Sequence, residues 1–309
     1  MVIDPLLSLG GLFAGVVVGL TGLGGAAIVT PMLLLLFNIP APVAVSTDLV
    51  SAAVMKPVGG GVHIARRTPH YQVVLALSLG SVPGVLLGTW LFSQIAEMES
   101  GEDTLKRIIG VVLLVAVVVS LIRMRLRRFQ EAHAGESLNF STGRLVASGV
   151  VGLVVGILVG LTSVGSGTLI AASLLIIFPA MLPSRLVGTD LVQAIPMLIV
   201  GALAHMSLGE VDWKVVVSLL IGQVPGVFIG ARVSSRYNGQ ELRWLLLVLV
   251  ACGGLALLGL PKGPAAVLTV VGVLAFGVPI MLRAWRTRHD HHQAPPPPHD
   301  QPVDILADD

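Results

Sequence analysis

The chain has 309 residues, of which 54% are hydrophobic and 12% charged, and its mean hydropathy is +0.91. Soluble domains do not have this composition, and its one cysteine, Cys252, excludes an internal disulfide and a cysteine metal cluster. The net charge of +2 says little, because membrane orientation depends on which loops carry Lys and Arg. We expect an all-α, multi-pass protein of a cell membrane, with the lipid bilayer as its surroundings, no cofactor, no metal and no nucleic-acid partner.

Apolar stretches of the length that crosses a bilayer follow one another from Leu6 to Leu282. Each half of the chain is predicted to hold one broken or re-entrant helical hairpin followed by three transmembrane helices. In the first half these elements are residues 6–37, 42–65, 72–95 and 105–122. In the second half they are 144–178, 184–208, 213–235 and 241–260, and an extra C-terminal helix at 264–283 has no partner.

These elements divide the chain into regions. Residues 1–122 are predicted to form the first membrane repeat, 123–143 a basic cytoplasmic linker, and 144–260 the second repeat. The segment before the first apolar stretch lacks the basic residues of a secretory signal, so this stretch is expected to remain in the mature protein. Residues 285–309 are polar and Pro-rich, and we interpret them as a disordered cytoplasmic tail whose histidines are solvated rather than metal ligands.

An internal repeat relates the two halves. Gly15–Thr21 reads GVVVGLT and Gly156–Thr162 reads GILVGLT, an offset of 141 residues. Thr-Asp-Leu recurs at Thr47 and Thr189, VPGV recurs at Val82 and Val224, and both of these pairs are 142 residues apart. Polar and proline positions in register make chance similarity improbable, so the sequence indicates a membrane protein built from two copies of one unit.

Charges in equivalent loops are opposite in sign. Arg66 and Arg67 follow the second element of the first half, whereas Glu210 and Asp212 follow its counterpart. Since basic loops face the cytoplasm, equivalent loops lie on opposite sides and the halves are inverted copies. This interpretation requires two crossings in each broken element, an external N-terminus and a cytoplasmic C-terminus. The competing topology has one long span for each broken element.

The broken elements contain Gly-rich tips with hydroxyl side chains. A helix that breaks in hydrocarbon leaves backbone N–H and C=O groups without partners, and the half-helix that follows presents free N–H groups and the positive end of its dipole. Two such tips from inverted halves would attract an anion near the midplane, although small residues also allow close helix packing. The candidate substrate-binding residues of the two tips are Thr21, Gly22, Gly24, Gly25, Thr162, Ser163, Gly165, Ser166 and Gly167.

Longer stretches of the chain resemble a known family. TGLGGAAIVTPMLLLLF, AVSTDLVSAAVMKPVGGGVH and GSVPG in the first half, with VGTDLVQAIPMLIVGALAH, GEVDW and GQVPG in the second, resemble the sulfite exporter TauE/SafE family of membrane transporters. The resemblance covers about Gly15 to Leu260. It implies transport of small sulfur oxyanions and organosulfonates. The sequence departs from the family at the first tip, at Ser166 and at Ala172, and these departures affect the substrate rather than the fold.

Ionisable residues within spans mark a pathway or a paired charge. Lys56 and His63 share one helix face, so Lys56 is a candidate to hold the anion and His63 to accept a proton. Lys56 could instead pair with Asp48 or extend toward the membrane interface. The second half repeats the pattern with Asp190 and His205 but has Leu198 in place of the lysine. Both aspartates could instead tie neighbouring elements together by hydrogen bonds, and both histidines are expected near membrane interfaces.

The sequence favours a secondary transporter of a small anion over the alternatives. Ser81 and Gln223, which precede matched Pro-Gly pairs, are candidate neutral donors to the anion. No protease, hydrolase or nucleotide-binding motif is present, so an enzyme is not expected. An ion channel or a proton-coupled transporter of another organic anion are the alternative functions. A homo-oligomer is a possible assembly.

Overall fold

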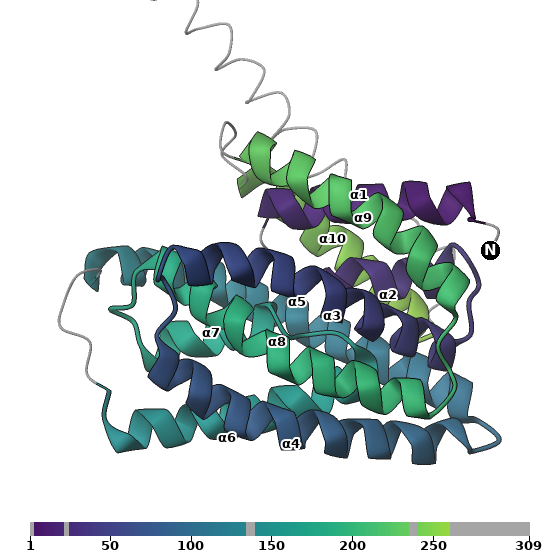
Figure 1. Ribbon diagram of the computed structural model, residues 1–309, viewed down its shortest axis with the longest axis horizontal. Coiled ribbons are helices and arrows are strands. Elements are labelled where there is room, and N and C mark those ends of the chain that lie inside the picture. The colour runs from purple at the N-terminus through teal and green to yellow at the C-terminus, as the bar shows by residue number, and fades with distance from the viewer. Residues whose placement is uncertain (1–2, 22–24, 134–139, 235–239, 260–309) are drawn as a thin grey trace, which may run out of the picture.

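The computed structural model describes residues 3–21, 25–133, 140–234 and 240–259, and within this part of the chain every regular element is an α-helix (Figure 1). The ten helices are α1 (Pro5–Thr21), α2 (Ala26–Leu35), α3 (Ala41–Ala65), α4 (Tyr71–Ala96), α5 (Gly101–His133), α6 (Thr142–Thr162), α7 (Thr168–Ile177), α8 (Pro183–Ser207), α9 (Trp213–Ser234) and α10 (Gln240–Leu257).

The helix bounds agree with the sequence prediction at most ends. One difference is α5, which continues to His133, so the first part of the predicted linker is helical. The predicted extra helix at 264–283 and the tail at 285–309, with its histidines, lie outside the described residues. Five helices of the described chain, α4, α5, α6, α8 and α9, are long and apolar enough to cross a membrane.

The outward faces of these helices suit a lipid environment. Leu75, Leu79 and Trp90 on α4 and Val146 and Val150 on α6 are more than half exposed. Exposed apolar surface of this extent would drive association in water, whereas lipid tails cover it without cost.

Both predicted broken elements are helix pairs with a short break. α1 is followed by α2, and α6 is followed by α7, and each second member has only ten residues. Ten residues of α-helix are about 15 Å long, which is half of the hydrocarbon thickness of about 30 Å. Each of these short helices therefore begins at a break within the bundle.

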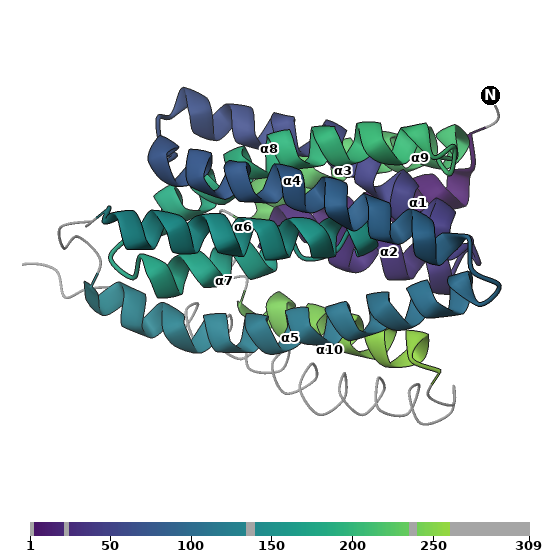
Figure 2. The same ribbon diagram turned by 90° about the horizontal axis from the view of Figure 1, so that it is seen from below.

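The two halves exchange helix partners. α4 packs along α6, and α1 packs along α9, and these are the most extensive helix interfaces (Figures 1 and 2). Glycines allow the close approach: a Cβ added at Gly84 would lie 2.4 Å from the carbonyl oxygen of Leu153, and one added at Gly226 would lie 2.5 Å from that of Leu12. The matched positions show that one packing arrangement is used twice.

Equivalent helices of the two halves also contact each other, and they run antiparallel. α3 crosses α8 with Gly60 near Ile195 and Leu49 near Gly201, so rising numbers on one helix meet falling numbers on the other. α5 and α10 also pack antiparallel, with Gly110 near Leu257 and Leu114 near Gly254.

Two reciprocal hydrogen bonds join the halves at the ends of these helices. The backbone N–H of His70, just before α4, donates to Thr189 Oγ1 of α8 at 3.0 Å. The backbone N–H of Asp212, just before α9, donates to Thr47 Oγ1 of α3 at 3.2 Å. Each half therefore fixes the start of a helix that belongs to the other.

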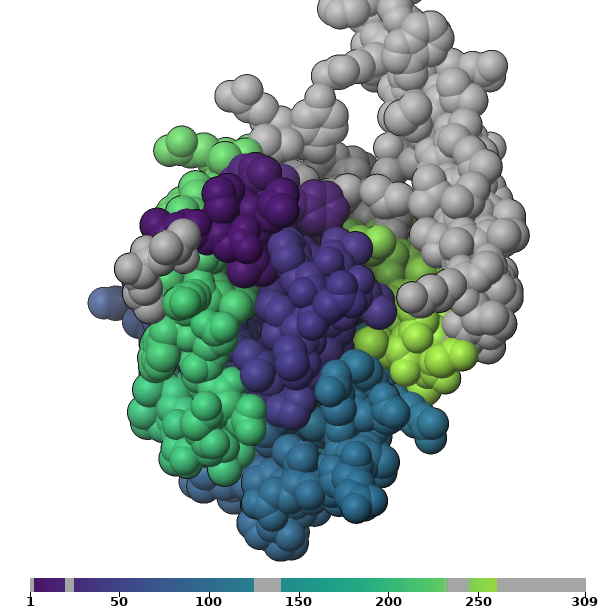
Figure 3. Space-filling view, turned by 90° about the vertical axis from the view of Figure 1, so that its right-hand side faces the viewer, coloured from purple at the N-terminus to yellow at the C-terminus, as the bar shows by residue number. Residues whose placement is uncertain are grey.

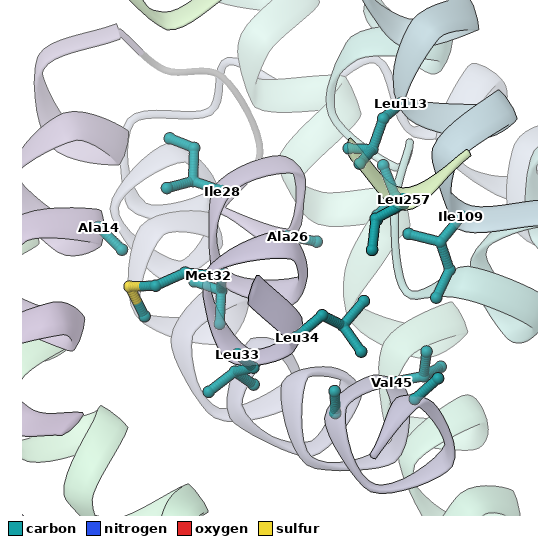
Figure 4. Packing of buried hydrophobic residues seen from close by; sticks show 14 of the residues in the cluster. Ala14, Ala26, Ile28, Met32, Leu33, Leu34, Val45, Ile109, Leu113 and Leu257 are labelled. Carbon is teal, nitrogen blue, oxygen red and sulfur yellow. The ribbon is translucent and has the colours of Figure 1, made fainter. Parts of the chain in front are cut away.

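The half-helix α2 lies inside the larger of two main apolar clusters (Figure 4). Its Met32 side chain lies toward Ala14 of α1, while Leu34 lies on the side of Ile109 of α5 and Leu257 of α10. The half-helix α7 has the corresponding place in the second cluster, with Ile170 and Leu174 almost fully buried. Packing on both sides therefore holds each half-helix in the interior.

Candidate functional site

The second tip is a buried turn between α6 and α7. Ser163 ends α6 in the left-handed conformation with φ of 61°, and Gly165 has φ of 112°, which a side chain would strain. The Thr162 hydroxyl donates to the Leu158 carbonyl and accepts the backbone N–H of Val164, so it closes the end of α6. Ser166 and Gly167 are also buried. In the first tip, Gly22 and Gly24 and the side chain of Thr21 lie outside the described residues, and Gly25 precedes α2.

The first residues of the two half-helices share a small cavity. Ala27 and Ile28 of α2 and Thr168 of α7 line it, together with residues of α5 and α10 that include Ser120. The cavity has about 20 Å³ for the centre of a water molecule, which is room for about one water. Thr168 Oγ1 is buried and has no hydrogen-bond partner in the part of the chain that the structure describes. The N-terminal turns of α2 and α7 therefore reach the same cavity, and a meeting of the two tips themselves stays a prediction.

Asp48 is a buried carboxylate held by hydroxyl groups from both halves. Thr30 of α2 donates to Asp48 Oδ2 at 2.6 Å, and Ser163 of the second tip donates to the same atom at 2.9 Å. The Asp48 side chain is 2% exposed. Its carboxylate thus ties the first half-helix to the tip of the other half, which is the tying role that the sequence left open for this residue.

Asp190, the equivalent residue of the second half, has a different environment. It is 5% exposed, and its Oδ1 has no hydrogen-bond partner among the described residues. Gln193, one turn further along α8, approaches the carboxyl, yet neither of its amide atoms has hydrogen-bond geometry with any group. Lys56 of α3 and Arg123 of α5 act on Asp190 electrostatically. Positive charges of α3 and α5 therefore act on this carboxyl, and among the described residues no ion pair joins Lys56 to Asp190 or to Asp48.

The two histidines, His205 and His63, also differ in burial and in their hydrogen-bond partners. His205 is fully buried, where the sequence placed it near a membrane interface, and both ring nitrogens have partners: Nε2 lies 2.9 Å from the carbonyl oxygen of Gly160 and Nδ1 lies 2.8 Å from Ser46 Oγ. A carbonyl only accepts, so Nε2 carries the proton and Nδ1 accepts from the serine. His63 is half-buried at the end of α3, with Nδ1 2.9 Å from Thr68 Oγ1.

Ser81 and Gln223 lie at the matched helix crossings rather than in the described cavity. A Cβ added at Gly156 would meet the backbone carbonyl of Ser81, and one added at Gly15 would meet that of Gln223. Both side chains are buried, and Ser81 Oγ has no partner. The sequence prediction did not include Thr30, Gln193 or Ser46, because a hydroxyl or amide on an apolar helix face carries no signal until its partner is known.

An all-helical chain with lipid-suited outer faces, two matched halves and two broken helices that start at one internal cavity is a multi-pass membrane transporter. The sequence model of the family "Sulfite exporter TauE/SafE" matches residues 7–257, and the chain belongs to this family.

Curated relatives have the same general description. The chain is 34% identical over 249 residues to the probable membrane transporter protein YjnA of Bacillus subtilis. The aligned region covers 80% of this chain and 97% of that protein. The chain is also 27% identical over 244 residues to the probable membrane transporter protein YdhB of the same organism, which covers 79% and 96%. No solved structure matches the chain.

Proposed function

We propose that the protein is a secondary transporter of a small anion, and that this anion is a sulfur oxyanion or an organosulfonate such as sulfite or sulfoacetate. The observation that carries the proposal is the shared cavity at the first turns of α2 and α7, where Thr168 Oγ1 has no partner. The positive ends of the α2 and α7 helix dipoles favour an anion there. The family description supplies the class of anion.

Transport is proposed to occur by alternating access between inverted halves. Antiparallel contact of equivalent helices, α3 with α8 and α5 with α10, supports this relation, because a two-fold axis in the membrane plane reverses the direction of every helix. The cavity has room for about one water in this conformation, so an oxyanion enters only when the half-helices move apart. A closed conformation of this kind is a required intermediate of alternating access.

The loop charges support an orientation with the N-terminus outside and a cytoplasmic C-terminus. The N-terminus, the α4–α5 loop with Glu97 and Glu99, and the α8–α9 loop with Glu210 and Asp212 gather at one end of the bundle (Figures 1 and 3). The α3–α4 loop with Arg66 and Arg67 lies at the other end, beside the start of α8 (Figure 1). The basic end is proposed to face the cytoplasm of the cell membrane.

The proposed function is tested in proteoliposomes that contain the purified full-length protein. Uptake of sulfite, thiosulfate, sulfoacetate and taurine is measured with and without an imposed pH gradient. Uptake of at least one of them that is saturable and absent from protein-free vesicles supports the function, whereas no uptake of any of the four would refute it.

The cavity is tested with a matched pair of variants on α7. Thr168→Val removes the hydroxyl that lines the cavity and keeps the side-chain volume. Ser173→Ala removes a hydroxyl that donates to the Leu169 carbonyl within the same helix. We expect only Thr168→Val to raise the half-saturation concentration of the transported anion. Equal behaviour of the two variants would place the anion elsewhere.

A further inference from the structure

Asp48 and Asp190 occupy equivalent positions but have unequal hydrogen-bond partners. Thr30 and Ser163 donate to Asp48. In the second half, the counterpart of Thr30 is Ala171 by sequence offset or Ala172 by helix start, and the counterpart of Ser163 is Gly22. None of these has a hydroxyl. The second half therefore has the Asp190 carboxyl but lacks the two hydroxyl donors that bind the Asp48 carboxyl in the first half.

The atoms left without partners form one polar group on α8. Asp190 Oδ1, Gln193 Oε1 and Gln193 Nε2 are all buried and unpartnered, and the two residues lie one turn apart on the same helix face. Buried polar groups in native proteins nearly always have partners, so each exception calls for an explanation such as a bound water, an ion or a catalytic role. Acceptor and donor atoms together suit a group that exchanges a proton.

The charges that face Asp190 come from several packed elements. α3 contributes Lys56, and α5 contributes Arg123. His63, His70 and Arg185 lie at the end where α8 begins, with His70 N–H bound to Thr189 and His63 beside Gly188. α7 has no ionisable residue, and α4 has none beyond its first residue, Tyr71. Asp190 is thus a single buried carboxyl on which the positive charges of both Lys56 and Arg123 act.

We propose that Asp190 is the proton-coupling carboxyl of this transporter, a role that rests on the proposed anion transport. Without substrate, the Asp190 carboxylate compensates the Lys56 ammonium. When an anion enters the bundle, it adds a second negative charge in a medium of low dielectric, so Asp190 takes a proton from the water on the side from which the anion entered.

The proton step is complete within the chain and its solvent. One O–H bond forms at Asp190 Oδ1, and the same bond breaks when the proton leaves to water on the opposite side with the anion. Rotation of the Gln193 side chain, one turn along the same helix, lets Oε1 accept from the protonated carboxyl and lets Nε2 donate to the carboxylate after the proton leaves. Anion and proton therefore cross together.

The main test compares Asp190→Asn with wild type in proteoliposomes, using each of sulfite, thiosulfate, sulfoacetate and taurine that wild type moves. Asn resembles the protonated carboxyl, so the loaded carrier can still cross and anion-for-anion exchange should persist. Without substrate, the Asn variant has no carboxylate to compensate the Lys56 ammonium, so the empty transporter should not return to its starting conformation. Net uptake, and its stimulation by an inward-acid gradient, should therefore be lost. Asp190→Glu should restore gradient-driven uptake in part. Undiminished stimulation in Asp190→Asn would overturn the proposal.

Asp48→Asn is the matched control, because it removes the equivalent carboxyl of the other half. We expect it to lower stability and to leave the remaining transport sensitive to the pH gradient. Loss of gradient coupling in Asp48→Asn with retention in Asp190→Asn would also overturn the assignment.

Infrared spectroscopy tests the proton site without any transport assay. If wild type moves none of the four compounds, the proposed function is refuted, but the spectra still decide whether Asp190 takes up a proton. The pH-difference spectra of wild type and Asp48→Asn should share one carboxylic acid C=O component that is missing from Asp190→Asn, in addition to the bands of the other carboxyls. Absence of any titrating band that depends on Asp190 would overturn the proton site independently of transport.

Discussion

Loss of the Thr30 hydroxyl should destabilise the protein by much more than loss of an ordinary buried hydroxyl. Thr30 Oγ1 donates to Asp48 Oδ2 at 2.6 Å, and both residues are almost fully buried. A hydrogen bond to a charged group contributes about 1.5–3 kcal/mol, and Thr30→Val removes it while keeping the side-chain volume. Ser163→Ala removes the second donor, at 2.9 Å, and should cost about the same amount.

Thr89→Val is the matched control, because the Thr89 hydroxyl is equally buried but donates to the Val85 carbonyl within its own helix. The assay is an unfolding titration with SDS in mixed micelles, followed by circular dichroism. The loss in the double variant should differ from the sum of the single losses, because both donors hold one oxygen atom. If Thr30→Val and Thr89→Val shift the unfolding midpoint equally, the Asp48 carboxylate is not the link between the halves that we describe.

Three further predictions concern charge, packing and topology. Lys56→Met should insert normally but raise the half-saturation concentration about tenfold, a loss of about 1.4 kcal/mol; unchanged kinetics in proteoliposomes would show that Lys56 does not contact the anion. Gly84→Val should prevent accumulation in the membrane, because its Cβ would lie 2.4 Å from a backbone oxygen, whereas Gly61→Ala meets no atom within 4 Å and should accumulate normally; immunoblots of membrane fractions distinguish the two, and equal accumulation would contradict the close crossing. Single cysteines at Ser8, Ser137 and Gln293 in a Cys252→Ser background should react with an impermeant thiol reagent outside whole cells only at position 8; labelling of 137 or 293 would refute the inverted orientation.

The sequence was sufficient for features that depend on local chemistry. α3 and α8 begin within one residue of the predicted position, because each has a proline in its first turn, where proline suits a helix. The break before α7 was predicted because two glycines and hydroxyl residues interrupt an apolar run. Both signals act over a few residues, so no knowledge of the tertiary structure is needed to use them.

Features that depend on contacts between the halves were not predictable in this way. Thr30 lies on an apolar helix, and nothing near it in sequence indicates that Asp48 is its partner. The burial of His205 likewise depends on Gly160 and Ser46, which lie on two other helices. The extension of α5 was missed because the basic run from Arg123 was interpreted as a linker, although arginine favours helix.

The reciprocal bonds at Thr47 and Thr189 have a consequence for the order of assembly during synthesis. α4 is complete in the nascent chain long before Thr189 exists, so the backbone N–H of His70 waits for a partner that is made 119 residues later. A fragment that ends after α5 would lack this acceptor, and it would leave its own Thr47 without the N–H of Asp212. In two copies of such a fragment inserted in opposite orientations, the His70 N–H of each copy could donate to the Thr47 hydroxyl of the other. Two copies of the first half would therefore need opposite orientations in the membrane to replace the missing second half.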